Sequence, residues 1–296
     1  MSSSWVAEGG GLEAYVFDGN DLAREEHWRT LRDNLRHVTE LGVERLTLHF
    51  PTENADWVGS AAAFDKLRRF CDLASETGAA GVTLHANRFV SQEDWLGHDL
   101  AASRARTVER TAELDAHLAD SPLWIGIENL PVIGAQGIDY DSVFVRPEDF
   151  APLLELNSPR VGVTWDICHW AVTYSTLAAM AQLQQQPEPV DAFALPALEV
   201  KHIHFSSFRG HAMPFWPDLC TEGVPPQDGD FSESLLAAML LNTIEAAQEN
   251  VGVVFEVQEE DYRNRKNCWT TRSWLDLAPQ LSGVRTGMRR SDDRAS

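Results

Sequence analysis

The sequence predicts an α/β protein, and within that class a closed (β/α)₈ TIM barrel is the first choice. Seven short apolar runs are distributed along the 296 residues, and most of the segments between them have helical periodicity. Near-continuous apolar strands that alternate with helices are typical of a parallel sheet covered on its outer face. A chain of this length can close such a sheet into a barrel, and an open doubly wound sheet is the alternative.

The predicted strands consist mainly of apolar and β-branched residues, as buried strands do. They are LEAYVF from Leu12, VERLTLHF from Val43, AGVTLH from Ala80, LWIGIE from Leu123, RVGVTWD from Arg160, VKHIHF from Val200 and VGVVFE from Val251. Two segments between them, 27–42 and 64–79, carry an apolar residue at every third or fourth position. Gly42 and Gly78 stand where a glycine commonly ends a helix, so we expect two helices that stop there.

Six of the seven strand runs carry an ionisable side chain at their last or next-to-last position, which is unusual for apolar strands. These residues are His49, His85, Glu128, Asp166, His204 and Glu256. The carboxyl ends of barrel strands all lie at one face, so we expect the six side chains to converge in one cup. Three carboxylates buried side by side would be unfavourable without a compensating cation. The pattern therefore predicts a divalent metal site.

The predicted metal ligands come from four of these strand ends. They are Glu128, Asp166, His204 and Glu256. Three oxygens and one nitrogen suit a single ion of Mn²⁺, Mg²⁺, Co²⁺ or Zn²⁺, with Mn²⁺ as the first choice. His169 follows Asp166 by three residues and is expected in the following loop, above the site. His202 shares a strand face with His204 but lies one layer deeper, so we expect it behind the ligands.

Four pieces of this pattern together resemble a known superfamily. IGIENLP, VGVTWDICHW, VKHIHFSS and VGVVFEVQ are similar to the successive metal-bearing strands of the xylose isomerase-like TIM barrels, with a resemblance that runs from Leu12 to Glu259. That superfamily contains sugar and sugar-phosphate isomerases and epimerases, related dehydratases, and endonuclease IV. The resemblance implies that the four predicted ligands hold the metal, that Glu128 and Glu256 also act as acid and base, and that His169 touches substrate.

The same resemblance raises a question about the first strand of the barrel. If Glu128 ends the fifth strand, as in the family, LEAYVF becomes the second strand. SSSWVAEGGG is then all that remains for the first. We expect that strand to be short, missing or supplied in an unusual way.

The predicted activity is that of a metal-dependent isomerase or epimerase acting on a sugar, or on a sugar-like polyol or cyclitol. A carboxylate would remove the proton next to a metal-polarised carbonyl, and an enediolate would result. His49, His85, Arg209 and His211 are further candidates for contact with substrate. Core packing is the alternative role for the first two, and a solvated loop position for the last two.

Three other functions remain as alternatives. A metal-dependent dehydratase of the inosose or dehydroshikimate type would share the first proton abstraction. Endonuclease IV has extra histidines where His49 and His85 fall, but 45 acidic against 24 basic residues give a net charge of −21, which disfavours binding to nucleic acid. A non-catalytic barrel that binds metal for stability is the third. We expect a small carbohydrate-like molecule as the partner, and the sequence leaves a homo-oligomer open.

The sequence also predicts the domain organisation and the location of the protein. We expect one barrel domain over residues 1–284 and a polar, disordered tail over 285–296. No apolar run is long enough to span a bilayer, and MSSSWVAEGGG lacks the order of a secretory signal, which favours a cytoplasmic protein without a membrane partner. The four cysteines form no C-x-x-C pair, so we expect reduced thiols.

Overall fold

The computed structural model describes residues 10–86, 97–132, 143–183, 199–210, 220–247 and 251–281. Its main sheet has seven parallel strands in the order β1, β2, β3, β4, β5, β6, β9. They are β1 (Leu12–Tyr15), β2 (Leu46–His49), β3 (Gly81–Leu84), β4 (Trp124–Glu128), β5 (Val161–Asp166), β6 (Val200–Phe205) and β9 (Gly252–Phe255). Each coincides with one of the seven predicted strand runs. The α/β barrel class is therefore confirmed.

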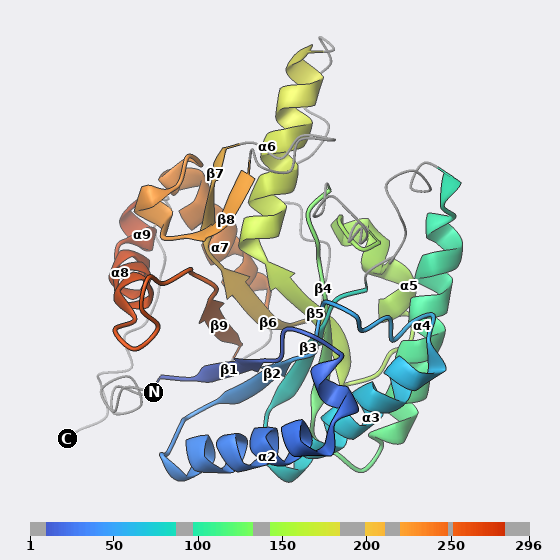
Figure 1. The fold of residues 1–296 in the computed structure, drawn as a ribbon. Helices are drawn as coiled ribbons and strands as arrows, with labels where there is room; N and C mark the ends of the chain where they lie inside the picture. The colour runs from blue at the N-terminus through green and yellow to red at the C-terminus, as the bar shows by residue number, and fades with distance from the viewer. Residues whose placement is uncertain are drawn as a thin grey trace, which may run out of the picture.

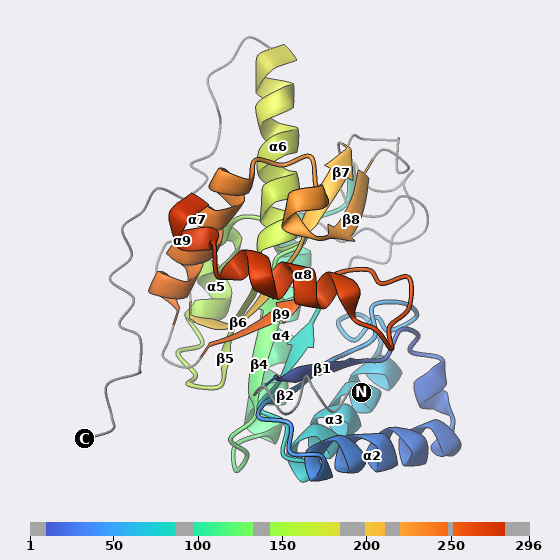
Figure 2. The ribbon, with the colours of Figure 1, turned by 90° about the vertical axis from the view of Figure 1, so that its left-hand side faces the viewer.

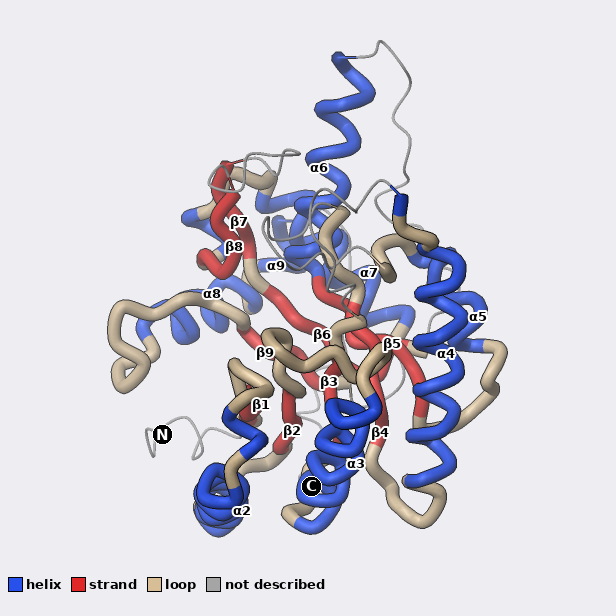
Figure 3. The backbone as a smooth tube through the Cα atoms, turned by 45° about the vertical axis from the view of Figure 1, so that its right-hand side comes forward, coloured by secondary structure: helices blue, strands red, loops and turns tan. Residues whose placement is uncertain are grey.

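Most helices lie around the outside of the strands, and the helix that follows β5 extends away from the sheet (Figure 1, Figure 3). The helices are α2 (Glu25–Glu40), α3 (Ala61–Glu76), α4 (Leu100–His117), α5 (Ala151–Leu154), α6 (Ile167–Leu183), α7 (Glu233–Ala246), α8 (Lys266–Leu275) and α9 (Ala278–Leu281), with short 3₁₀ turns η1 (Asp21–Ala23), η3 (Pro147–Phe150) and η5 (Pro226–Asp228). As predicted, α2 and α3 are followed by glycines in the left-handed region, Gly42 with φ 79° and Gly78 with φ 76°. Within the described ranges no helix is both long and apolar enough to cross a membrane.

The barrel has a seam between β1 and β9. No ladder joins these two strands within the described residues. Their side chains are largely half-buried, whereas those of β2 to β6 are buried throughout. A hollow of about 820 Å³ lies along the seam, lined by Glu13, His202 and Val253 among others. The segment left for the first strand, 2–11, lies outside the described residues except for Gly10 and Gly11, which are in neither a helix nor a strand. The expected tail also lies outside the described residues.

Two elements near the carboxyl ends of the strands were not predicted in detail. The segment after β6 begins a small hairpin, in which β7 (Ser207–Gly210) pairs antiparallel with β8 (Cys220–Val224). The tryptophan-rich segment after β9 forms α8, which crosses in front of β9 and β6 in Figure 2. Trp274 of α8 stacks on Phe205 of β6 with 5.5 Å between ring centroids, so this helix covers the sheet. All four cysteines are unpaired, as expected.

The layer of side chains below the strand ends is polar, unlike the branched apolar layers usual in such barrels. Thr83 and Thr164 share a hydrogen bond of 3.0 Å, and Thr47 donates one of 3.0 Å to Glu13. Gly126 makes room for this layer, because a Cβ there would lie 2.2 Å from the Thr164 hydroxyl oxygen. The polar interior continues upward into the cup at the strand ends.

Candidate active site

The four predicted metal ligands come together at the carboxyl ends of their strands. Each offers one ligand atom, and all four atoms lie within 4.8 Å of one another. Glu128 and Asp166 are the last residues of β4 and β5, His204 lies in β6, and Glu256 directly follows β9. The Nδ1 atom of His204 lies 3.3 Å from Glu128 Oε1 and 3.2 Å from Glu256 Oε1. This geometry can hold one cation between the four side chains.

Asp166 is held so that one of its oxygens remains for a ligand. Its Oδ1 accepts the backbone N–H of His169 at 2.7 Å and so caps the start of α6. Asn129 clamps its backbone, donating to the Asp166 carbonyl at 2.9 Å and accepting the Asp166 N–H at 2.6 Å. In the described structure Asp166 Oδ2 is buried and accepts no hydrogen bond. A buried carboxylate oxygen without a donor is costly, and a metal ion would satisfy it.

The pKa values show the same need for a cation. Burial, helped by the charges of Glu256 and Glu128 and opposed by His169, raises the pKa of Asp166 to about 7. Burial lowers the pKa of His204, but Glu256, Glu13 and Glu128 outweigh it and hold this pKa well above its usual range. Without a metal, the cluster therefore retains a proton on Asp166 below about pH 7, and another on His204. A divalent ion would displace these two protons and supply the positive charge in their place.

Glu128 lies among four imidazole rings. Its Oε2 lies 3.1 Å from His49 Nε2 and 3.0 Å from His85 Nε2, while its Oε1 lies 3.3 Å from both His169 Nδ1 and His204 Nδ1. Burial raises the pKa of Glu128, but His204 and then His85 outweigh it and keep that pKa well below its usual range. Glu128 is therefore an anion held between histidines.

The two histidines predicted as substrate contacts both pair with Glu128. His49 is buried, and its Nδ1 donates to the Phe50 carbonyl at 2.8 Å. Burial lowers the pKa of His49, but the hydrogen bond to Glu128 reverses the shift and raises it. The His85 side chain is 15 % exposed and that of His49 5 %, so His85 is the more accessible of the pair.

His169 lies beside the cluster, 3.3 Å from Glu128, but on the first turn of α6 and not in the loop that the sequence predicts. Its Nδ1 donates to the Asn129 carbonyl at 2.8 Å, and its Nε2 lies 3.7 Å from Glu222 on β8. Arg209, on β7, donates from Nε to the Asp228 carbonyl at 2.6 Å, which ties it to η5 beside the hairpin. His211 lies outside the described residues, so its predicted contact with substrate stays a prediction.

Exposure separates the four clustered side chains into two kinds. Glu128 and Asp166 are 1 % exposed and His204 is 0 % exposed, whereas Glu256 is 35 % exposed. Burial raises the pKa of Glu256, but the charge of His204 outweighs it and lowers this pKa, so the carboxylate is ionised near neutral pH. Glu256 is thus the member of the cluster most accessible to solvent.

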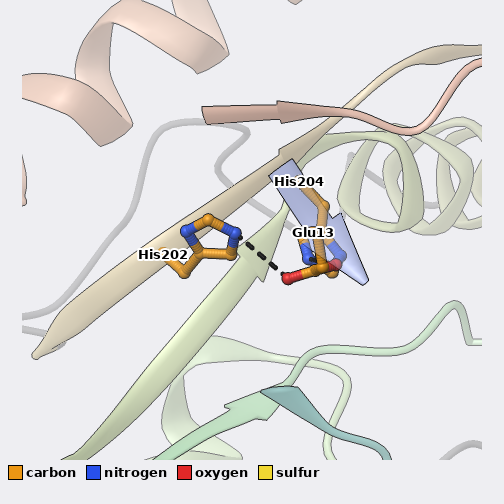
Figure 4. A group of neighbouring side chains, drawn as sticks. All are labelled: Glu13, His202 and His204. Atoms are coloured by element: carbon orange, nitrogen blue, oxygen red, sulfur yellow. Dashed lines mark ion pairs between the residues drawn. The ribbon is translucent and has the colours of Figure 1, made fainter. Parts of the chain in front are cut away.

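Sequence reasoning missed several residues that form this site. Asn129 had a signal, because it completes the E-N piece in IGIENLP. The sequence held no signal for Tyr15 or Glu222 beyond their position in or near predicted elements. The ring centroid of Tyr15 lies 4.8 Å from that of His49, and Glu222 lies 3.7 Å from His169 Nε2. Burial raises the pKa of Tyr15 to about 12, so it stays a neutral hydroxyl. Glu13 lies beneath His204 and is also new, while His202 lies one layer deeper as expected (Figure 4).

The chain belongs to the xylose isomerase-like TIM barrel family, whose model matches residues 11–275. No curated protein matches the sequence at a significant level. Among solved structures, a D-tagatose 3-epimerase-like protein is 14 % identical with a TM-score of 0.60, and the match covers 94 % of this chain and 93 % of that one. A 3-keto-D-glucoside 4-epimerase from E. coli is 15 % identical with a TM-score of 0.53, covering 91 % and 98 %. The IOLI protein with a bound zinc atom is 13 % identical with a TM-score of 0.58, covering 96 % and 92 %. At these identities the likeness shows the fold.

Proposed function

We propose that this protein is a divalent-metal-dependent isomerase or epimerase of a sugar, or of a sugar-like polyol or cyclitol. The observation that carries the proposal is the cluster of Glu128, Asp166, His204 and Glu256, with ligand atoms within 4.8 Å of one another at the cup of the barrel. Family membership supports it, as do the two epimerase-related structures of the same fold. A leading alternative is a dehydratase that begins with the same proton abstraction.

The residues present suit one divalent ion. Three carboxylates and one imidazole would hold it, and Asp166 Oδ2 accepts no competing hydrogen bond in the described structure. Such an ion, when bound, polarises a substrate carbonyl and acidifies the neighbouring C–H bond. The zinc atom in the IOLI protein supports a divalent metal, and Mn²⁺ remains our first choice for a site rich in carboxylate oxygens.

The proposed proton transfers use Glu256 and Glu128. Glu256 is ionised and 35 % exposed, so it can accept a proton from a carbon of a bound substrate. Glu128 is the second candidate, because both glutamates lie next to the same nitrogen of His204. The distance from His204 Nδ1 is 3.3 Å to Glu128 Oε1 and 3.2 Å to Glu256 Oε1. An epimer would form if Glu128 delivered a proton to the opposite face of the same carbon, a proton that Glu128 would first take from a neighbouring imidazole such as His169. The proton held by Glu256 would then leave to solvent. An isomer would form if Glu256 returned the removed proton to the neighbouring carbon.

The test compares amide variants at saturating metal. Glu256→Gln and Glu128→Gln should lose turnover by about 10²-fold or more, since each removes a group that moves a proton. Asp166→Asn is the matched control, because it removes a carboxylate that acts only as a ligand. Its activity should partly recover with excess metal. Recovery of the glutamate variants by metal would contradict the assignment of both as bases.

Solvent labelling distinguishes the reaction types. Turnover in D₂O by an epimerase or isomerase of this kind places deuterium on the carbon next to the carbonyl, and a dehydratase releases water as well. A panel of free ketoses, keto-cyclitols and their phosphates supplies the substrates. Turnover without solvent exchange and without loss of water would favour a direct hydride shift and would refute proton transfer by Glu256.

A further inference from the structure

Glu13 contacts both histidines of β6 (Figure 4). Its Oε1 lies 3.0 Å from His204 Nε2, and its Oε2 lies 3.3 Å from His202 Nε2. The Thr47 hydroxyl donates to the same Oε2 at 3.0 Å. The Glu13 side chain is 6 % exposed, so this carboxylate is buried and surrounded by donors. Glu13 belongs to β1, the first strand in the order of the sheet, whereas Glu256 follows β9, the last.

The two nitrogens of His204 face different partners. Nδ1 faces Glu128 and Glu256, at 3.3 Å and 3.2 Å, and so faces the metal position of the proposed function. Nε2 faces Glu13. An imidazole nitrogen that binds a metal needs its lone pair, which leaves the ring proton on the other nitrogen. A carboxylate that accepts this proton fixes the tautomer and the orientation of the ring.

We infer that Glu13 is the positioning residue of the metal site. It accepts the Nε2 proton of His204 and holds the ring so that Nδ1 is directed at the metal, an inference that rests on the proposed function. Thr47 and His202 engage the other oxygen and stop the carboxylate from turning away. In the described structure the contacts of His204 Nε2 and His202 Nε2 with Glu13, at 3.0 Å and 3.3 Å, are ion pairs that do not meet hydrogen-bond geometry.

A second metal ion held by Glu13, His202 and His204 is the competing explanation, since these three side chains could also group around a cation. Two features favour positioning. A second ion would have to share the His204 ring with the first, and the Thr47 hydroxyl already donates to Glu13 Oε2. The two explanations differ in the number of ions bound per chain, which can be measured.

The experiment measures Zn²⁺ affinity of the full chain by competition with a chelating indicator, so it does not depend on activity. We expect Glu13→Gln to weaken binding about 10-fold to 100-fold, and Glu13→Leu to weaken it further because no acceptor remains. Thr83→Val is the matched control. Thr83 is a buried residue of the same polar layer whose hydroxyl bonds to Thr164, and this variant should bind Zn²⁺ like the wild type.

A second measurement separates positioning from general damage to the fold. In the Co²⁺-loaded protein, Glu13→Gln should shift the visible absorption bands of the ion, while Thr83→Val leaves them unchanged. Wild-type affinity and an unchanged spectrum in Glu13→Gln would overturn the inference. Two ions bound by the wild type, one of them lost in both Glu13→Gln and His202→Gln while the other keeps its affinity, would assign Glu13 as a ligand instead.

The outcomes also separate this inference from the proposed function. Tight Zn²⁺ binding that weakens in Glu13→Gln, without turnover of any sugar or cyclitol, would contradict the isomerase proposal and leave the role of Glu13 intact. If the wild type turned over a substrate and Glu13→Gln bound metal as tightly as the wild type, the isomerase proposal would stand. The positioning role of Glu13 would then be wrong. If the wild type bound Zn²⁺ no more tightly than Asp166→Asn, the predicted metal site would not exist. That result would overturn both the proposed function and the role of Glu13.

Discussion

Replacement of Asp166 by asparagine should stabilise the metal-free protein at alkaline pH while weakening its hold on metal. Burial raises the pKa of this carboxyl from 3.8 to about 7. A difference of about three pKa units corresponds to about 4 kcal/mol, the upper limit of what ionisation of this group costs the folded state. The asparagine keeps an oxygen that can accept the His169 N–H, so the cap of α6 survives.

The sign follows from which state holds the proton. Between pH 4 and pH 7 the folded protein keeps a proton on Asp166 that the unfolded chain has lost. The contribution of this group to the free energy of unfolding is complete below about pH 4. It falls by about 1.4 kcal/mol per pH unit between about pH 4 and pH 7, and it is lost above about pH 7. His169 and His204 also have raised pKa values, so they add losses of the same sign above their ordinary range.

The assay is urea unfolding of both proteins in chelator at pH 5.5, 6.5, 7.5 and 8.5, repeated with saturating Zn²⁺. We expect the wild type to lose stability relative to Asp166→Asn as the pH rises, and the difference to level off above about pH 7. Added Zn²⁺ should then stabilise the wild type more than the variant, because ligand binding to the native state adds to stability. Parallel pH curves for the two metal-free proteins would refute the assignment of the buried proton to Asp166.

Three further outcomes are expected. The protein should not bind an abasic DNA duplex at physiological salt, because its net charge is −21. Metal-dependent nicking in a gel assay would instead support the nuclease alternative, in which His49 and His85 add ligands around Glu128. Gly126→Ala should lower the free energy of unfolding by about 1 to 3 kcal/mol, because the new Cβ would lie 2.2 Å from the Thr164 hydroxyl, whereas Gly97→Ala, with no atom within 4 Å, should leave urea unfolding unchanged. Dialysis against a chelator should abolish turnover, and re-addition of Mn²⁺ should restore it at least as well as Mg²⁺, Co²⁺ or Zn²⁺; full activity in the chelated protein would contradict metal dependence.

The sequence by itself determined the strands and the residues that end them. Strand identity depends on local patterns of apolar residues, and helix ends at Gly42 and Gly78 depend on the conformational freedom of one residue, so both are readable from short windows. The convergence of Glu128, Asp166 and His204 was predictable for a different reason. In a parallel barrel every strand ends at the same face, so position along the strand is enough to place a side chain in the cup.

Only the tertiary structure decided which groups each cup residue contacts. Glu13 pairs with His204 across 191 positions of sequence, and the pairing depends on the stagger of β1 against β6 and on the orientation of one imidazole ring. The structure likewise directs Glu128 toward His49 and His85, which the sequence had placed as contacts for substrate. Such contacts are set by distances of about 3 Å between side chains from separate strands, whereas the periodicity of a strand specifies only the face on which a side chain lies.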